Sequence, residues 1–161
     1  MDQPVFRSAS VGDLDRVMAF YRSYIGTPGC TWDENYPTRA LLLADHESGS
    51  LFGLYLNGLL VGSVSISKEN YMDDLPCWKC RSGAKDISRV VISPQYQGQH
   101  YGTALLQKTC SYLKAQNVNA IHLLVSPTNK RALQLYYSQQ FKNRGIFFLY
   151  GHDYLALEKI L

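Results

Sequence analysis

Two glycines, Gly98 and Gly102, lie in a segment whose composition suits the binding of phosphate groups. The segment runs from Pro94 to Thr103 and joins the end of an apolar run to the start of a helical pattern. Backbone N–H groups at the start of a helix have no intrahelical partner and lie at the positive end of the helix dipole. Glycine lets a pyrophosphate approach such amides closely. A simple helix cap explains the same two glycines, so this turn alone leaves both interpretations open.

Aromatic and acidic side chains gather in two irregular segments, one around residues 32–36 and the other over about 68–83. The faces of Trp and Tyr can hold an ammonium group or stack on a planar ring, and carboxylates attract a cationic amine. The alternatives are that the tryptophans fill the hydrophobic core and that the acids are simply solvated. The residues that we expect to line a substrate pocket are Trp32, Asp33, Tyr36, Tyr71 and Trp78.

Cys77 and Cys80 form a C-x-x-C pair, which suggests redox or metal chemistry. A thioredoxin-like site places the pair at a helix start after a strand, and this segment has no such pattern. A structural zinc site needs four ligands, and the chain has no second pair of this kind. Cys30, His46 or His122 could complete a site only through an accident of folding. We therefore predict that the chain holds no metal, with a redox or metal-binding protein as a competing hypothesis.

Hydrophobic spacing and turn signals predict the elements that position these residues. A capping box at Ser10–Asp13 and apolar residues at helical spacing predict a first helix over about 10–24. Pro37 suits the first turn of a second helix, which ends near Gly49. Asn57-Gly58 between two apolar runs indicates a hairpin with a type I′ turn. The strands predicted in this half cover about 5–8, 51–56 and 59–67.

The second half alternates strands and helices and therefore predicts a parallel crossover. A strand, a helix and a further strand in this order form a βαβ unit with parallel strands. The predicted elements are strands over about 87–92, 121–125, 143–149 and 152–159 and helices over about 101–116 and 129–139. We expect a single α/β domain over residues 1–161, with a mixed, mostly antiparallel sheet and about four helices. The parallel crossover would join the fourth and fifth strands.

Two motifs in this second half resemble those of the GNAT superfamily of N-acetyltransferases. The stretch from Val90 to Gly102 resembles the signature Q/R-x-x-G-x-G/A, which follows the fourth strand in that family. The stretch from Asn129 to Tyr136, followed by Phe141, resembles the second motif, N-x-x-A-x-x-x-Y and then G-F. The motifs occur in the family's order, and the family's strand order matches the predicted elements over nearly the whole chain. The resemblance implies the GNAT fold and acetyl-coenzyme A as co-substrate.

The resemblance also implies a role for each matching position. The backbone of Val90, Val91 and Ile92 would contact the pantetheine arm, and the amide near Ile92 would donate to the thioester carbonyl. Asn129 would hydrogen-bond to the pantetheine or to neighbouring backbone. Tyr136 would be the general acid that protonates the leaving thiolate. The main-chain amides that hold the pyrophosphate would come from Gly98, Gln99, His100, Tyr101, Gly102 and Thr103.

Asp86 is the candidate general base, because several family members place a carboxylate that works through water at this point of the fourth strand. The alternative interpretation of Asp86 is a solvated acid at the end of a strand, with no part in catalysis. Tyr137, which adjoins Tyr136, fits core packing better, since the spacing of the motif selects Tyr136. Two positions depart from the family pattern: His100 stands where Gly or Ala is usual, and Gln140 replaces the Gly of the G-F pair. If position 100 needs a positive φ, histidine is strained there.

The function that these residues indicate is transfer of acetyl from acetyl-CoA to a primary amine of a small molecule or peptide. The transfer would proceed by direct attack in a ternary complex. The alternative is a non-catalytic sensor that binds acyl-CoA. Retention of Tyr136 and Asn129 argues against the sensor.

Composition adds limits on partners and location. The net charge of +3, from 16 basic and 13 acidic residues, is too small to suggest nucleic-acid binding. No apolar run reaches the roughly 20 residues that span a bilayer, and no secretory signal is recognisable. We expect a cytoplasmic protein with no membrane partner. Dimers are frequent in the family, so a homodimer stays open.

Overall fold

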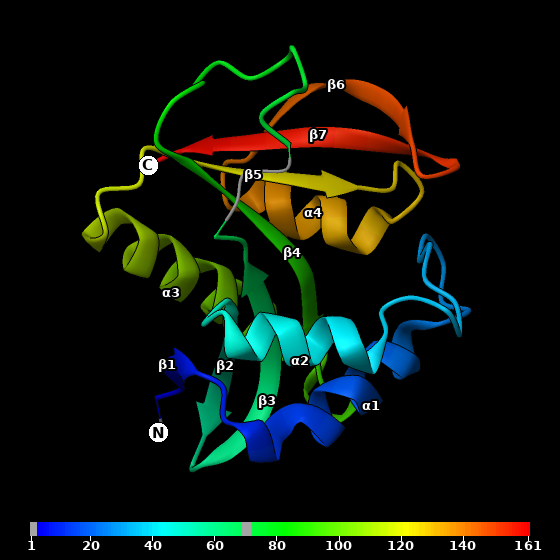
Figure 1. The fold of residues 1–161 in the computed structure, drawn as a ribbon, viewed down its shortest axis with the longest axis vertical. Coiled ribbons are helices and arrows are strands. Elements are labelled where there is room, and N and C mark those ends of the chain that lie inside the picture. The colour runs from blue at the N-terminus through cyan, green and yellow to red at the C-terminus, as the bar shows by residue number, and fades with distance from the viewer. Residues whose placement is uncertain (1–2, 69–71) are drawn as a thin grey trace.

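The computed structural model describes residues 3–68 and 72–161, which form one seven-stranded sheet with helices on both faces (Figure 1). In chain order the strands and helices are β1 (Val5–Ser8), the 3₁₀ turn η1 (Val11–Asp13), α1 (Leu14–Tyr24), α2 (Arg39–Glu47), β2 (Leu51–Leu56), β3 (Leu59–Ile66), β4 (Ala84–Ile92), the 3₁₀ turn η2 (Pro94–Tyr96), α3 (Tyr101–Ala115), β5 (Ala120–Val125), α4 (Lys130–Ser138), β6 (Lys142–Leu149) and β7 (His152–Ile160).

The sheet has the strand order β1-β2-β3-β4-β5-β7-β6, in which β4 and β5 are parallel and all other neighbours are antiparallel. The described residues form four α-helices. These observations confirm the predicted α/β class, the mostly antiparallel sheet and the parallel crossover through α3. In the part of the chain that the structure describes, no helix is both long and apolar enough to cross a membrane.

Each face of the sheet buries its own hydrophobic core. On one face, Leu105, Leu106 and Leu113 of α3 pack with alternate residues of β2 such as Phe52 and Leu54. On the other face, the residues of α1 and α2 pack on Leu51 and other β2 side chains. Neighbouring side chains of a strand point to opposite faces, so one apolar strand serves both cores.

Local chemistry explains most element boundaries. Asn57 and Gly58 have φ values of 52° and 80°, as the type I′ hairpin requires. The predicted first helix begins instead with the turn η1, in which the Asp13 carboxylate accepts hydrogen bonds from the backbone and hydroxyl of Ser10. Helix α2 starts at Arg39 rather than at Pro37, because the Thr38 hydroxyl accepts the Leu41 N–H and caps it.

Strands β4 and β5 are paired at their starts and separate towards their ends. The registered pairs run from Ala84 with Ala120 to Asp86 with His122 and end there. In Figure 1 the two strands start side by side near the C-terminus and then diverge. Opposite Val64 of β3, β4 carries two residues, Arg89 and Val90, so the strand bulges at the point of divergence. The bulge turns β4 away from β5 and opens the space between them.

Candidate functional site

A cavity of about 1090 Å³ lies between the separated ends of β4 and β5 and extends to the start of α3, to α4 and to the α1–α2 connection. It contains most of the residues that the sequence singled out. The predicted residues that line it are Trp32, Asp33, Tyr36, Asp86, Val90, Ile92, Gly98, His100, Tyr101, Gly102, Thr103, Asn129 and Tyr136. The predicted residues that do not line it are Val91, Gln99 and Trp78.

The two glycines of the turn before α3, Gly98 and Gly102, serve different purposes. Gly98 has a φ of 74° and open space around its α-carbon, so it provides a left-handed backbone. A β-carbon at Gly102 would lie 3.1 Å from Leu135, so this glycine allows α3 to pack closely against α4. The first-turn residues of α3, Tyr101 to Thr103, line the cavity, and amides at the start of a helix have no intrahelical partners. Arg131 also lines the cavity and donates to the Gln97 side chain at 3.2 Å, and it adds a positive charge that the sequence analysis missed.

Both departures from the family pattern have a left-handed backbone. His100, the residue that precedes α3, has a φ of 67°, and Gln140 has a φ of 69°. A non-glycine residue is strained in this region, by roughly 1–2 kcal/mol. The chain therefore keeps the glycine geometry at both positions although the side chains differ.

Tyr24 binds both backbone groups of Ile92, which is the second contact that the sequence analysis missed. The Ile92 N–H donates to the Tyr24 hydroxyl at 3.0 Å, and that hydroxyl lies 3.3 Å from the Ile92 carbonyl oxygen. Gln97 donates to the same carbonyl at 3.2 Å. The Ile92 amide, expected to donate to the thioester, is thus engaged by a side chain 68 residues earlier in the chain.

Tyr136 is buried in the wall of the cavity, with 8% of its surface exposed, and its ring packs against Phe141 with 5.6 Å between centroids. Burial raises the pKa of its hydroxyl, and the nearby Tyr24 acts in the same direction. The hydroxyl is therefore protonated at neutral pH and can donate a proton. The expectation that Tyr137 packs in the core is wrong, because Tyr137 is 44% exposed.

Asn129 caps helix α4. Its side-chain oxygen accepts the Ala132 N–H at 3.2 Å. Gly29 of the α1–α2 connection packs on it so closely that a β-carbon at Gly29 would lie 2.3 Å from the Asn129 α-carbon. This contact brings the α1–α2 connection across to the second half of the sheet and closes one side of the cavity.

Asp86 lies deep in the sheet, with 1% of its surface exposed, and borders the cavity from β4. One carboxylate oxygen accepts the Met72 N–H at 3.0 Å. Burial raises the pKa of this carboxyl above its ordinary value, against the opposing effects of the Met72 hydrogen bond and of His122. The expected alternative, a solvated acid, does not describe it.

Aromatic rings of α1 and of the α1–α2 connection, Tyr24, Trp32 and Tyr36, form part of the cavity wall. Trp32 meets Tyr21 edge to face, with 5.5 Å between centroids, and is tilted against Tyr24. The Tyr36 hydroxyl accepts from Arg89 at 3.0 Å, and Arg89 forms an ion pair of 2.6 Å with Asp45. Arg89 has a φ of 51° in the β4 bulge, which is a strained position of the kind that gathers at functional sites.

One of the predicted aromatic residues, Trp78, lies elsewhere. Trp78 is 4% exposed and stacks on His122 with 3.8 Å between centroids. Its indole N–H donates to the Met72 carbonyl at 2.7 Å. Tyr71 lies outside the described residues. Trp78 therefore covers the paired starts of β4 and β5 and does not line the cavity.

Comparison with known proteins identifies the family. The family model for the acetyltransferase (GNAT) family matches residues 17–141. No curated protein matches the chain. The chain is similar in structure to a GNAT-family acetyltransferase from Streptococcus agalactiae, with a TM-score of 0.82, 18% identity and coverage of 100% of this chain and 98% of the other.

Two further solved structures are similar over nearly their whole length. One is the ribosomal-protein-S18-alanine N-acetyltransferase of Escherichia coli, with a TM-score of 0.74, 19% identity and coverage of 98% of this chain and 94% of the other. The other is the coenzyme A complex of PaiA N-acetyltransferase from Thermoplasma acidophilum, with a TM-score of 0.73, 18% identity and coverage of 99% of both chains. These likenesses agree on the fold. Together with the match over residues 17–141, they show that the chain belongs to the GNAT acetyltransferase family.

Proposed function

We propose that this protein binds acetyl-CoA between β4 and β5 and transfers the acetyl group to a primary amine in a ternary complex. The observation that carries the proposal is the cavity itself. One continuous space is bordered by the amides at the start of α3, by the Tyr136 side chain and by an aromatic and acidic end suited to an acceptor. Pyrophosphate, thioester and amine could therefore occupy it together.

The cofactor would extend along β4. Its pyrophosphate would accept hydrogen bonds from the backbone of Gly98 to Thr103, where the helix dipole of α3 favours an anion. Arg131 adds a positive charge beside this site. The pantetheine arm would lie against Val90 and Ile92 like an added strand. For the Ile92 N–H to donate to the thioester carbonyl, the Tyr24 hydroxyl must first release it.

The chemistry is an addition followed by an elimination at the thioester carbon. The neutral amine attacks this carbon, a tetrahedral oxyanion forms, and the carbon–sulfur bond then breaks. Tyr136 would donate its proton to the departing sulfur, a role that burial supports by keeping the hydroxyl protonated. Asp86 would accept the ammonium proton through water, which its position on the cavity border supports.

The acceptor would enter at the end formed by Trp32, Asp33 and Tyr36. Aromatic faces and a carboxylate suit an ammonium group that must approach before it loses its proton. The similar Escherichia coli protein acts on an alanine of a ribosomal protein, so the amine of a peptide belongs among the candidates besides small-molecule amines.

A screen of primary amines for release of coenzyme A tests the proposal. Purified protein and acetyl-CoA are mixed with polyamines, aminoglycosides, amino-acid derivatives and short peptides, and free thiol is measured. We expect release with at least one amine class and much less release from Tyr136→Phe. Tight binding of acetyl-CoA with no release for any amine would contradict transfer and favour the acyl-CoA sensor. Failure to bind acetyl-CoA would contradict both.

A further inference from the structure

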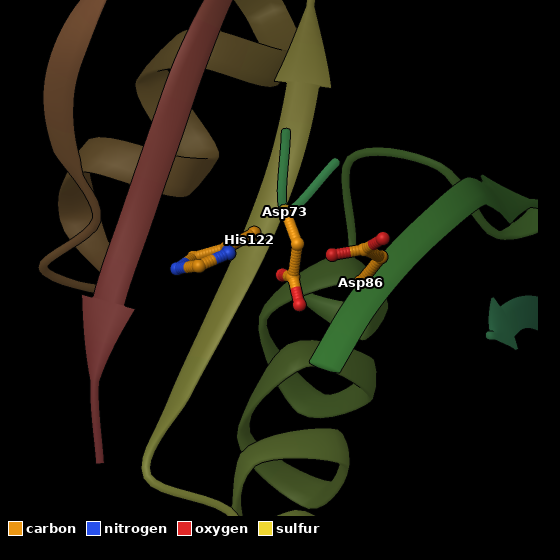
Figure 2. A group of neighbouring side chains, drawn as sticks. All are labelled: Asp73, Asp86 and His122. Carbon is orange, nitrogen blue, oxygen red and sulfur yellow. The ribbon is translucent and has the colours of Figure 1, made fainter. Parts of the chain in front are cut away.

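Three titratable side chains face one another at the paired starts of β4 and β5. Asp86 comes from β4, His122 from β5, and Asp73 from the connection that precedes β4 (Figure 2). One possible ligand atom from each side chain lies within 4.8 Å of those of the other two. Asp86 and His122 are buried and Asp73 is exposed, so the group is reached from solvent on the Asp73 side.

Two buried atoms in this group have no hydrogen-bond partner among residues 3–68 and 72–161. They are Nδ1 of His122, on a side chain that is 0% exposed, and Oδ1 of Asp86, on a residue that is 1% exposed. The other oxygen of Asp86 already accepts from the Met72 N–H. Buried polar atoms are nearly always satisfied, so a pair of unsatisfied atoms that face each other calls for an occupant between them.

The contact on the opposite side of the His122 ring determines whether Nδ1 is a hydrogen-bond donor or an acceptor. Nε2 of His122 lies 2.8 Å from the Glu158 carboxylate. The same carboxylate accepts hydrogen bonds from Arg144 Nε and from the backbone N–H groups of Lys79 and Cys80, so it acts as an acceptor on every side. Nε2 therefore donates to Glu158 and carries a proton. In the neutral imidazole, Nδ1 then presents a lone pair towards the oxygens of Asp86 and Asp73.

This arrangement has the features of a metal-binding histidine. In metal sites the ligating histidine typically donates its other N–H to a carboxylate, which orients the ring and strengthens the ligand. Glu158 has this position, and its remaining acceptor sites are filled by Arg144 at 2.8 Å and by the backbone N–H groups of Lys79 and Cys80. The Trp78 ring, stacked on the imidazole, holds its plane in place.

We propose that Asp73, Asp86 and His122 bind one divalent transition-metal ion such as Zn²⁺. Two carboxylates and one imidazole nitrogen supply three ligands, and water would complete the coordination from the exposed side. The imidazole nitrogen favours a transition metal over Mg²⁺, which prefers oxygen ligands. Metal–ligand distances of about 2.0–2.2 Å require the ligand atoms to move closer together, and the exposed Asp73 is free of the sheet and can make that movement.

The ion would tie the connection that contains Asp73 and Trp78 to the sheet. It would also hold Asp86, the proposed base, as a ligand, so bound Zn²⁺ should slow acetyl transfer. The site is inferred from the geometry of the three side chains alone, so this proposal does not rest on the proposed function. It differs from a site at the C-x-x-C pair: the Cys80 thiol donates to the Ser82 carbonyl at 3.2 Å, and the group of facing ligand atoms contains no cysteine. It also departs from the sequence-based expectation of no metal, which considered His122 only as a partner for the cysteines.

The test is titration of Zn²⁺ into chelator-treated protein, followed by calorimetry and by thermal unfolding. We expect one Zn²⁺ per chain and a higher melting temperature in its presence, with no such shift for Mg²⁺. Asp73→Asn should weaken Zn²⁺ binding by more than about tenfold, and Glu158→Gln, which alters the support of the ring, by about 10–100-fold. Asp73 is exposed, so its variant should fold, as circular dichroism would verify.

Matched controls separate this site from adventitious binding. Asp74→Asn removes the same charge one residue further along and should leave the affinity unchanged. The double variant Cys77→Ser and Cys80→Ser should also bind Zn²⁺ like the wild type. Absence of stoichiometric Zn²⁺ binding would overturn the proposal. Equal binding by Asp73→Asn, or loss of binding in the cysteine variant, would overturn it as well.

Discussion

The two ends of the β4–β5 pair differ in almost every physical respect. At the start, where Asp86 is registered with His122, the strands are hydrogen-bonded and covered by Trp78, and they enclose buried charged groups. At the other end the strands have separated around a cavity lined by backbone, by Tyr136 and by the start of α3. One pair of parallel strands thus contains a closed polar cluster and an open cleft.

The difference follows from the bulge at Arg89 and Val90. Before the bulge, the backbone N–H and C=O groups of β4 and β5 form hydrogen bonds within the sheet. The buried polar side chains there must therefore form hydrogen bonds with other side chains or with loop backbone. After the bulge, backbone groups such as those of Ile92 have no strand on the β5 side, and the Tyr24 hydroxyl satisfies them instead. Backbone groups that a side chain satisfies can be passed to a ligand, whereas ladder hydrogen bonds cannot be passed on without breaking the sheet. The paired end therefore serves stability and the separated end serves binding.

The largest effect is expected at the paired end, from Glu158→Ala. This change would leave His122, Arg144 and two backbone amides without their buried acceptor. Breaking a buried ion pair from one side costs about 3–5 kcal/mol, and we expect a loss of that size in the free energy of unfolding. Urea denaturation measures it. Glu47→Ala, at an exposed position of α2, is the control, and a loss no larger than the control's would show that the cluster contributes little.

At the separated end, Tyr136→Phe should affect chemistry rather than folding. Removal of the proton donor should lower kcat by about 100-fold, because general acid catalysis contributes on the order of 10²–10⁴-fold. The affinity for acetyl-CoA should stay close to the wild-type value, since the ring remains. Steady-state kinetics and calorimetry separate the two quantities. Tyr137→Phe, the exposed neighbour, should keep full activity, and an equal loss in both variants would contradict the assignment.

A smaller effect is expected where the cleft meets α3. His100→Gly relieves a φ of 67° but makes the unfolded chain more flexible, so the net gain should be about 0.5–1 kcal/mol. The melting temperature should rise by about 1–4 °C. Gly98→Ala, at a φ of 74°, is the converse variant and should lower it. A lower melting temperature for His100→Gly would mean that the imidazole makes a stabilising contact that outweighs the strain.

The smallest effect concerns the pH dependence of kcat: we expect no decline in kcat as the pH rises from about 7 to about 10. Burial raises the pKa of Tyr136 above the ordinary tyrosine value of about 10, so the neutral donor persists to higher pH. With an active amine, kcat measured from about pH 7 to pH 10 should rise or level off as the amine loses its proton. A decline with an apparent pKa of about 8–9 that disappears in Tyr136→Phe would show that burial does not hold the proton on this residue.

Elements that depend on short-range signals were predictable. The hairpin at Asn57-Gly58 and the turn before α3 follow from local backbone preference, and the structure has both within a residue or two of the expected bounds. Much of the cavity lining was predictable from motif positions such as Gly98 and Tyr136 and from the aromatic and acidic residues of the irregular segment around Trp32. Tyr24 was missed because its contact with Ile92 joins residues 68 positions apart, and no local pattern of residues indicates such a contact.

His122 offered one local signal that was not used. A polar residue inside the apolar run from Ile121 to Val125 must either face solvent or find buried partners. The sequence alone could not say that the partners would be Glu158 and Asp86, because they come from different strands and meet only through the sheet register. Trp78 was wrongly expected at the acceptor pocket, because the sequence does not show which part of the sheet its segment covers.

The sequence by itself determined the order of strands and helices, the fold class and the glycine turn before α3, because these depend on hydrophobic period, turn chemistry and motifs of neighbouring residues. The tertiary structure alone decided which side chains meet across the sheet. It placed the bulge at Arg89, separated β4 from β5 beyond Asp86, and gathered Asp73, Asp86 and His122 at the paired end. Such contacts follow from strand register and packing, which depend on the whole chain at once.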